Sequence, residues 1–194
     1  MPSRARPEAP VPWIDELRTR LAARRSPPAE APEGSRRAAV LVPLFVRDGG
    51  LWVLFTRRTD ALEHHRGQIA FPGGAEEESD DSLLATALRE TREEIGVAED
   101  AVVPLGALSP LVTVTDFYVT PFVGAIPHPY PFQPAESEIA ELIEAPIVSL
   151  ADPAILEERL LPGRTEPTLF YRFGSHVIWG ATARMLRELL DALR

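Results

Sequence analysis

Apolar residues recur along this chain with two different spacings, which predicts a mixture of helices and strands. The first helical pattern lies over residues 12–24 and predicts a short amphipathic helix. Its apolar face could pack on the same chain or on a second copy, so a homodimer contact is first expected here. The prolines of residues 26–35 predict a linker after this helix. The apolar residues at helical spacing are Trp13, Ile14, Leu17 and Leu21.

Several segments show the continuous or alternating apolar pattern that is typical of strands. Residues 38–46 and 51–56 flank the turn residues Asp48-Gly49-Gly50, which predicts a β-hairpin. A closing hairpin is predicted over residues 168–173 and 176–179. Further strands, interrupted by prolines, are predicted at 102–109, 111–114 and 117–126.

Two later segments return to helical spacing, at residues 82–94, where Gly96 is the expected stop, and at 181–193. Residues 138–148 are compatible with a strand or a helix, and Asp152-Pro153 is predicted to open a short helix to about residue 160. Residues 127–134 are predicted to form a surface loop. Strands with interspersed helices and no regular βαβ alternation predict an α+β fold, an α/β/α sandwich in which a mixed β-sheet is flanked by helices.

Composition narrows the classes of function. The net charge of −9 argues against a broad nucleic-acid-binding surface. The chain has no cysteine and no lysine, which excludes thiolate metal sites, cysteine nucleophiles and Schiff-base chemistry, but arginines can still bind phosphate. No run of apolar residues is long enough to span a membrane, and the N-terminus lacks the apolar core of a signal peptide. We therefore expect a cytoplasmic protein without a membrane partner.

Three carboxylates at the end of the 82–94 helix are the strongest candidates for chemistry. Glu90, Glu93 and Glu94 have the spacing i, i+3, i+4, which places them on one face. Such a cluster suits a divalent cation, although a solvated acidic face is the alternative for an isolated motif. Arg89 can pair with Glu93 and hold it in one rotamer, and the glycines at 73–74 allow the main chain to approach a ligand closely.

The segment that ends in this helix resembles the signature box of the Nudix hydrolases. That box has a glycine, a spacer, an acid, seven residues, and then Arg-Glu-hydrophobe-x-Glu-Glu-x-Gly-hydrophobe; this chain reads RETREEIGV at residues 89–97. Two features depart from it. Thr91 stands where the family usually has a larger aliphatic residue, and Asp81 takes the early acidic position with six rather than five residues after Gly74.

The extra residue before Asp81 resembles a feature of the coenzyme A pyrophosphatase branch of this family, whose box has the same insertion. That branch carries an upstream motif of the form Leu-x-x-His-x-Gly-Gln-x-x-Phe-Pro-Gly-Gly, and this chain reads LEHHRGQIAFPGG at residues 62–74, a full match. Residues 54–58 and 178–183 are also similar to segments of the branch. The resemblance implies an N-terminal extension over residues 1–35, with the short helix and the proline-rich linker, and a Nudix domain over residues 36–194.

The resemblance implies a metal-dependent diphosphatase that cuts coenzyme A and its derivatives to 3′,5′-ADP and 4′-phosphopantetheine. Mg²⁺ or Mn²⁺ would be held by the three glutamates, with a backbone carbonyl of Gly73 or Gly74. Two or more metals can activate water and stabilise charge on the leaving phosphate. The candidates for the general base are a glutamate of the box and, in a downstream segment, Glu138 and Glu136.

The upstream motif is expected to contact or shape the substrate pocket. A loop-stabilising hydrogen bond is the alternative for its histidine, and a solvent-facing position is the alternative for each arginine. Candidates to contact substrate are His65, Gly67 and Gln68; candidates for the 3′-phosphate of coenzyme A are Arg57, Arg58 and Arg66. Hydrolysis of ADP-ribose or another nucleoside diphosphate derivative is the alternative reaction, and a non-catalytic nucleotide-binding module is the alternative class.

Overall fold

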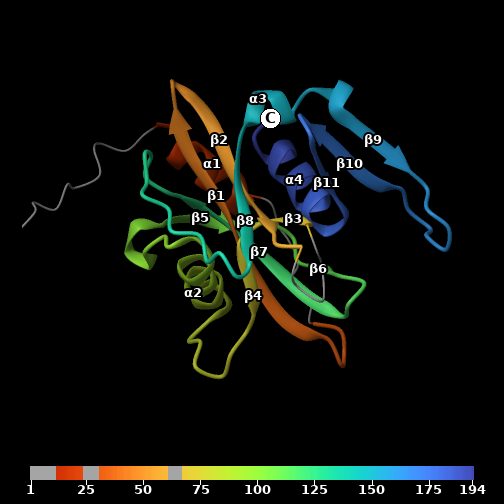
Figure 1. Cartoon of the computed structure of the whole chain (residues 1–194), viewed down its shortest axis with the longest axis horizontal. Helices are drawn as coiled ribbons and strands as arrows, with labels where there is room; N and C mark the ends of the chain where they lie inside the picture. Colours follow the sequence, from red (N-terminus) through yellow and green to blue (C-terminus); the bar gives the residue numbers. More distant parts are fainter. Residues whose placement is uncertain (1–11, 24–30, 61–66) are drawn as a thin grey trace, which may run out of the picture.

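Strand β1 (Arg36–Arg47) is the centre around which the rest of the molecule is arranged (Figure 1). The computed structural model describes residues 12–23, 31–60 and 67–194. β1 turns at Asp48-Gly49, both with positive φ, into the antiparallel strand β2 (Gly50–Arg58), as the turn residues predict. On its other edge β1 pairs in parallel with β7 (Phe117–Ala125). The apolar residues of β1 are buried on both faces of the sheet, because a core cluster covers each face.

The described residues form an eight-stranded mixed sheet and a separate three-stranded antiparallel sheet. The large sheet has the order β3-β2-β1-β7-β5, with β4 paired to β1, β6 to β7 and β8 to β2. Its remaining strands are β3 (Ile69–Ala70), β4 (Gly73–Ala75), β5 (Val103–Ala107), β6 (Leu111–Val112) and β8 (Ile139–Pro146). The small sheet consists of β9 (Leu156–Arg159), β10 (Thr168–Phe173) and β11 (His176–Trp179).

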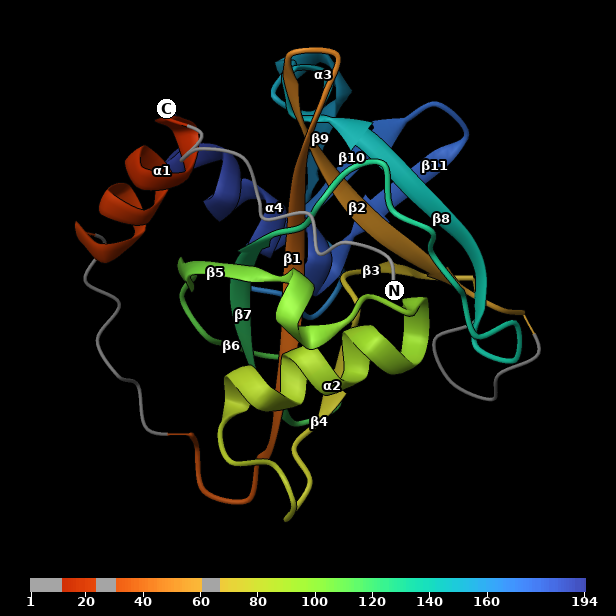
Figure 2. The ribbon, with the colours of Figure 1, turned by 90° about the vertical axis from the view of Figure 1, so that its left-hand side faces the viewer.

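Helices cover both faces of the large sheet, which confirms the predicted α+β class. Helix α2 (Leu83–Ile95) and helix α4 (Gly180–Ala192) lie on opposite sides of β1 (Figure 2). Successive residues of β1 alternate between the two sides: Ala39 and Leu41 join the cluster that contains α2, whereas Ala38 and Val42 join the cluster that contains α4. The short helical segments are α3 (Ile147–Leu150), η1 (Glu99–Ala101) and η2 (Pro153–Ile155).

The N-terminal helix α1 (Pro12–Ala23) packs on its own chain. Leu17 and Leu21 are buried in the cluster that contains α4, and Leu21 lies so close to Gly106 of β5 that a Cβ there would meet it at 2.9 Å. These two leucines are therefore not available for the dimer contact that the sequence left open. None of the helices in the described ranges has the length and hydropathy needed to cross a membrane.

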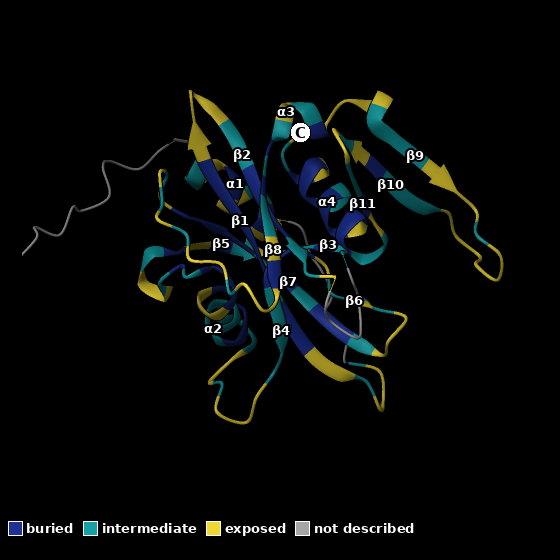
Figure 3. Ribbon diagram, in the orientation of Figure 1, coloured by how far each residue is buried: buried dark blue, intermediate teal, exposed yellow. Residues whose placement is uncertain are grey.

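The structure settles one ambiguous segment and corrects another. Residues 138–148 contain strand β8, which pairs with β2 along its whole length. The helix predicted from Asp152-Pro153 to residue 160 is wrong: a single 3₁₀ turn is followed by β9, which pairs with β10. The backbone of this segment is satisfied by a strand partner distant in sequence, and such pairing overrides weak local preference. β9 lies at the periphery, and two of its four residues, Glu158 and Arg159, are exposed (Figure 3).

Candidate active site

Helix α2 is capped at both ends, and the packing of its apolar residues on the sheet determines which of its residues face β4. The Ser82 hydroxyl accepts the backbone N–H of Ala85 at the start of the helix, and Gly96 ends it in the left-handed conformation with φ 75°. Ala87 and Ile95 are buried against the sheet. The helix face beside them therefore points to the glycine corner at 73–74.

Glu94 is the most buried carboxylate of the predicted cluster, with a relative exposure of 5%. Its Oε2 accepts the backbone N–H of Gly73 at 3.2 Å, and its Oε1 lies 3.6 Å from the Arg58 guanidinium. Burial raises the pKa of Glu94 to about 8, more than the opposing effects of Arg58 and the Gly73 N–H lower it. The positive charge near Glu94 is therefore too weak to offset the effect of burial on its carboxylate.

Glu90 and Glu93 are placed differently from each other. Glu90 lies over Gly74 and is half-buried, and burial raises its pKa against the effect of Arg89, whose guanidinium is 3.0 Å away. Glu93 remains at the edge of the site, with its side chain 52% exposed and 3.4 Å from Arg89. The predicted shared face thus consists of the half-buried Glu90 and the buried Glu94, with Glu93 on their solvent side.

Arg89 is held by Asp80 rather than by the acid that the motif register singles out. The Asp80 carboxylate accepts Arg89 Nε and Nη2 at 3.0 and 3.1 Å, and Arg89 Nη2 also donates to the Ala75 carbonyl. Asp81, its neighbour, is exposed. The predicted pairing of Arg89 with Glu93 is present, but it is one contact among several. Arg89 therefore connects the loop that contains Asp80, strand β4 and helix α2.

Arg58 and Glu138 join the site from β2 and from the segment before β8. Arg58 lies 3.7 Å from Glu138 and 3.6 Å from Glu94, so it connects the two carboxylates. The charge of Glu138 also contributes to the raised pKa of both Glu90 and Glu94. No signal in the sequence indicates this role of Arg58, because strand β8 brings Glu138 beside it only in the fold.

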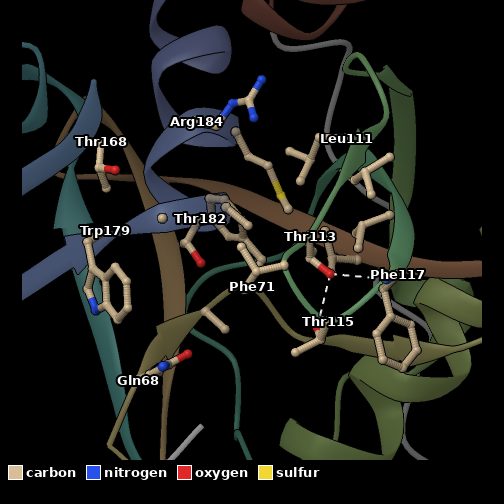
Figure 4. A pocket seen from close by; sticks show the side chains of 18 of the residues that line it. Gln68, Phe71, Leu111, Thr113, Thr115, Phe117, Thr168, Trp179, Thr182 and Arg184 are labelled. Carbon is tan, nitrogen blue, oxygen red and sulfur yellow. Dashed lines mark hydrogen bonds between the residues drawn. The ribbon is translucent and has the colours of Figure 1, made fainter. Parts of the chain in front are cut away.

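The other predicted substrate residues divide into three groups. Gln68 lines a cavity of about 520 Å³ that lies between α4 and β10–β11 on one side and β6–β7 on the other (Figure 4). Gly67, with φ 62°, lines a second cavity beside His176. Arg57 is not at the acidic helix: its Nε donates to Glu141 at 3.0 Å. Two further candidates, His65 and Arg66, lie outside the described residues.

The donor set fits a hard divalent cation in its chemistry. Glu90 and Glu94 offer oxygen ligands whose raised pKa values show that a nearby positive charge would stabilise them. Within the ranges that the structure describes, no three acidic or imidazole side chains are gathered closely enough to form a preformed cation site. Glu90 and Glu93 both contact Arg89, and Glu94 contacts Arg58. Metal binding would therefore compete with these arginines for the carboxylates.

Gly74→Ala tests whether the position of Glu90 matters. A Cβ on Gly74 would lie 2.5 Å from Glu90 Cδ, so the carboxylate must move. Because the obstructing atoms are the end of a side chain, the fold should tolerate the change. If the chain has the hydrolase activity that its motif implies, we expect that activity to fall by about tenfold or more, as for loss of a positioning contact at a metal site. The control is Gly50→Ala, where no atom lies closer than 3.6 Å. Unchanged turnover in Gly74→Ala would remove Glu90 from the reaction.

Comparisons with known proteins identify the family. A sequence model of the NUDIX domain matches residues 35–164. NudL of Cronobacter sakazakii, an uncharacterized Nudix hydrolase, is 38% identical over 187 residues, covering 91% of this chain and 92% of its own. NudL of Citrobacter koseri is 41% identical over 165 residues, covering 79% and 81%.

Solved structures agree on the fold. A MutT/nudix family protein from Enterococcus faecalis superposes with a TM-score of 0.51 at 18% identity, covering 92% of this chain and 67% of the other. A NUDIX hydrolase from Alicyclobacillus acidocaldarius gives 0.50 at 23% identity, covering 62% and 83%. The domain match and the identity over most of both chains show that this chain belongs to the Nudix hydrolase family.

Proposed function

We propose that this protein hydrolyses the diphosphate bond of coenzyme A to give 3′,5′-ADP and 4′-phosphopantetheine. The observation that carries the proposal is the motif at residues 62–74, which precedes the acidic helix α2 by one short loop. Its described part ends at Gly73 and Gly74, which lie against Glu94 and Glu90. The residues that resemble the coenzyme A branch are therefore beside the carboxylates that would serve the reaction.

In the reaction, the oxygen of water bonds to one of the two phosphorus atoms. The bond between that phosphorus atom and the bridging oxygen breaks. Glu90, Glu93 and Glu94 would hold Mg²⁺ or Mn²⁺, which supplies charge stabilisation and a lowered pKa for water. Glu138 is the proposed general base, because its half-exposed carboxylate is near the pair yet open to solvent. Arg58 would orient Glu138 and keep it near Glu94.

The two described arginines proposed for the 3′-phosphate already lie beside carboxylates. Arg57 is paired with Glu141, and Arg58 with Glu94 and Glu138. A phosphate could bind either guanidinium through other N–H groups or by replacing one of these carboxylates. Since arginine forks bind phosphate and carboxylate with similar geometry, such an exchange is chemically reasonable.

A product assay tests the proposed function. The protein is incubated with coenzyme A and Mg²⁺ or Mn²⁺, and the products are identified by mass spectrometry. We expect equal amounts of 3′,5′-ADP and 4′-phosphopantetheine, and a lower specificity constant for dephospho-coenzyme A, ADP-ribose and a dinucleotide. Faster cleavage of ADP-ribose would replace coenzyme A as the substrate. Tight binding without turnover, at saturating metal, would indicate a binding module instead.

A further inference from the structure

Arg58 is the last residue of β2 and lies between two carboxylates of the site. Its Nη1 is 3.6 Å from Glu94 Oε1, and its Nη2 is 3.7 Å from Glu138 Oε2. Glu94 belongs to helix α2, whereas Glu138 precedes strand β8. The guanidinium is therefore the point at which the acidic helix, the central sheet and the downstream segment meet.

Neither carboxylate holds Arg58 through a close hydrogen bond. Both distances exceed the length of an ordinary N–H···O hydrogen bond, about 2.7–3.2 Å. In addition, Arg58 Nε is buried and has no hydrogen-bond partner among the residues that the structure describes. Arg89 is held differently, because it donates to Asp80 at 3.0 and 3.1 Å. Charge attraction, rather than hydrogen bonding, thus keeps Arg58 beside Glu94.

A ligand can reach the Arg58 guanidinium. The side chain is 27% exposed, and it lines the cavity between α4 and β6–β7 (Figure 4). A guanidinium has five N–H donors in a planar fork, which matches two oxygens of a phosphate. A phosphate at this position would therefore accept hydrogen bonds that the two carboxylates do not accept at their present distances.

The charge state of the site decides whether Arg58 is available to a ligand. In the metal-free protein Glu94 is buried, and moving Arg58 away would leave that carboxylate without its cationic neighbour, which is costly. Once Glu94 ligates a divalent cation, it has a closer and larger positive charge, and that charge repels the guanidinium. Arg58 can then leave Glu94 while it keeps its contact with Glu138.

The position of Arg58 favours the diphosphate over the 3′-phosphate as its phosphate partner. The bond that is cut belongs to the diphosphate, which must therefore lie at the carboxylates that serve the reaction. Arg58 lies beside two of these carboxylates, Glu94 and Glu138. The 3′-phosphate is separated from the diphosphate by the ribose.

We propose that Arg58 exchanges partners: it neutralises Glu94 in the metal-free protein, and it binds a non-bridging oxygen of the substrate diphosphate once Glu94 ligates Mg²⁺ or Mn²⁺. This rests on the proposed function only in placing a nucleotide diphosphate at Glu90 and Glu94, whichever group the nucleotide carries. Arg58 makes and breaks no covalent bond; it stabilises the negative charge of the phosphate that water attacks. The contact with phosphate thereby depends on the metal.

Binding of a nucleotide that cannot be cleaved tests this exchange. The probe is α,β-methylene-ADP, titrated by calorimetry into wild type and Arg58→Gln, once with a chelator and once with Mg²⁺ shown to be saturating for each protein. With Mg²⁺ we expect Arg58→Gln to bind the probe about tenfold more weakly or worse, as for loss of a hydrogen bond to a charged group. With the chelator the two proteins should differ by less than about threefold, because Arg58 is then engaged with Glu94.

Two further variants complete this test. Arg58→Lys keeps the charge without the fork and should lose only part of the affinity, and it serves if Arg58→Gln does not fold. Arg172→Gln makes the same change of charge at an exposed arginine of β10 and should leave binding unchanged. Equal losses with and without Mg²⁺ in Arg58→Gln would indicate a structural role and overturn the proposal, and so would the absence of any loss with Mg²⁺.

Glu94→Gln tests the release of Arg58 without any metal. Glutamine carries no charge to hold the guanidinium, so the metal-free variant should bind the probe about tenfold more tightly than wild type. The gain should disappear when Arg58→Gln is added to Glu94→Gln. A gain that persists in the double variant would come from the lost repulsion between Glu94 and the probe, and it would contradict the release of Arg58.

These binding measurements separate the exchange from the proposed function. If coenzyme A is not cleaved but the probe shows the metal-dependent effect of Arg58, the proposed function fails alone. If coenzyme A is cleaved to the expected products but the effect of Arg58→Gln is the same with chelator and with Mg²⁺, the exchange fails alone.

Discussion

Glu94→Gln is expected to abolish most of the hydrolase activity and to stabilise the metal-free protein. Loss of a group that only supports a metal ligand commonly costs ten- to a hundredfold, so loss of an oxygen that is itself the proposed ligand should cost at least about a hundredfold. Stability should change in the opposite direction, because glutamine keeps the shape of Glu94 without the charge. The pKa of about 8 indicates a cost of a few kcal/mol, at ~1.4 kcal/mol per pKa unit.

The stabilisation should depend on pH. Below about pH 4 the carboxyl is protonated in both the folded and the unfolded chain, so wild type and variant should be equally stable. As the pH rises towards 8, the unfolded chain loses this proton first and binds fewer protons than the folded chain, so the wild type loses stability. Above about pH 8 both states are ionised and the full cost remains. The gain from Glu94→Gln should therefore grow between about pH 4 and pH 8.

Urea unfolding in the presence of a chelator, at about pH 5 and pH 8.5, measures this difference. The control is Glu99→Gln, an exposed glutamate one turn beyond α2, which should change neither activity nor the pH dependence. Added Mg²⁺ or Mn²⁺ should stabilise the wild type more than Glu94→Gln. Near-normal turnover would remove Glu94 from the ligand set, and equal stabilities at pH 8.5 would contradict its burial as a charged group.

Local signals in the sequence predict the helix of the site well. Helix α2 begins after Ser82 and ends before Gly96, within a residue or two of the expected positions. The spacing of Glu90 and Glu94 correctly predicts that they lie on one face of the helix. The exposure of Glu93 is not readable from spacing, since it depends on how far the helix is rotated over β4. Similarly, the i,i+4 rule identifies Arg89 with Glu93 but misses Asp80, which belongs to the preceding loop.

Contacts between distant segments account for what could not be predicted. Arg58 reaches Glu138 because β8 pairs with β2 across a long intervening sequence. The cavity has the same origin: Leu111 and Met185 are unremarkable apolar residues until β6 and α4 are placed around Phe71. The helix predicted over β9 is wrong because its strand partner, β10, lies beyond a loop. In each case the deciding interaction joins elements that local periodicity does not relate.

Asp80→Asn is expected to weaken both the fold and the reaction, while Asp81→Asn changes neither. The Asp80 side chain is 5% exposed and accepts from Arg89, from Thr86 Oγ1 and from the backbone N–H of Glu77. Removing one partner of a buried ion pair costs about 3–5 kcal/mol, but this loop is peripheral and partly screened by water, so we expect about 2 kcal/mol. Turnover should fall about tenfold, because Arg89 would no longer hold Glu90 in place.

The pH dependence separates a lost ion pair from a simple packing defect. Hydrogen bonds from Arg89 hold the pKa of Asp80 well below its usual range, so its stabilising effect is present above about pH 4 and is lost as the pH falls further. The difference in unfolding free energy between wild type and Asp80→Asn should therefore shrink in acid, where a packing defect would persist. A larger effect of Asp81→Asn than of Asp80→Asn would show that Asp81, the acid at the motif position, is the important one. It would contradict the pairing of Asp80 with Arg89. If Asp80 is the partner of Arg89, the acid that holds Arg89 lies one position before Asp81, the position that the motif gives. Arg89 keeps its contact with Glu90.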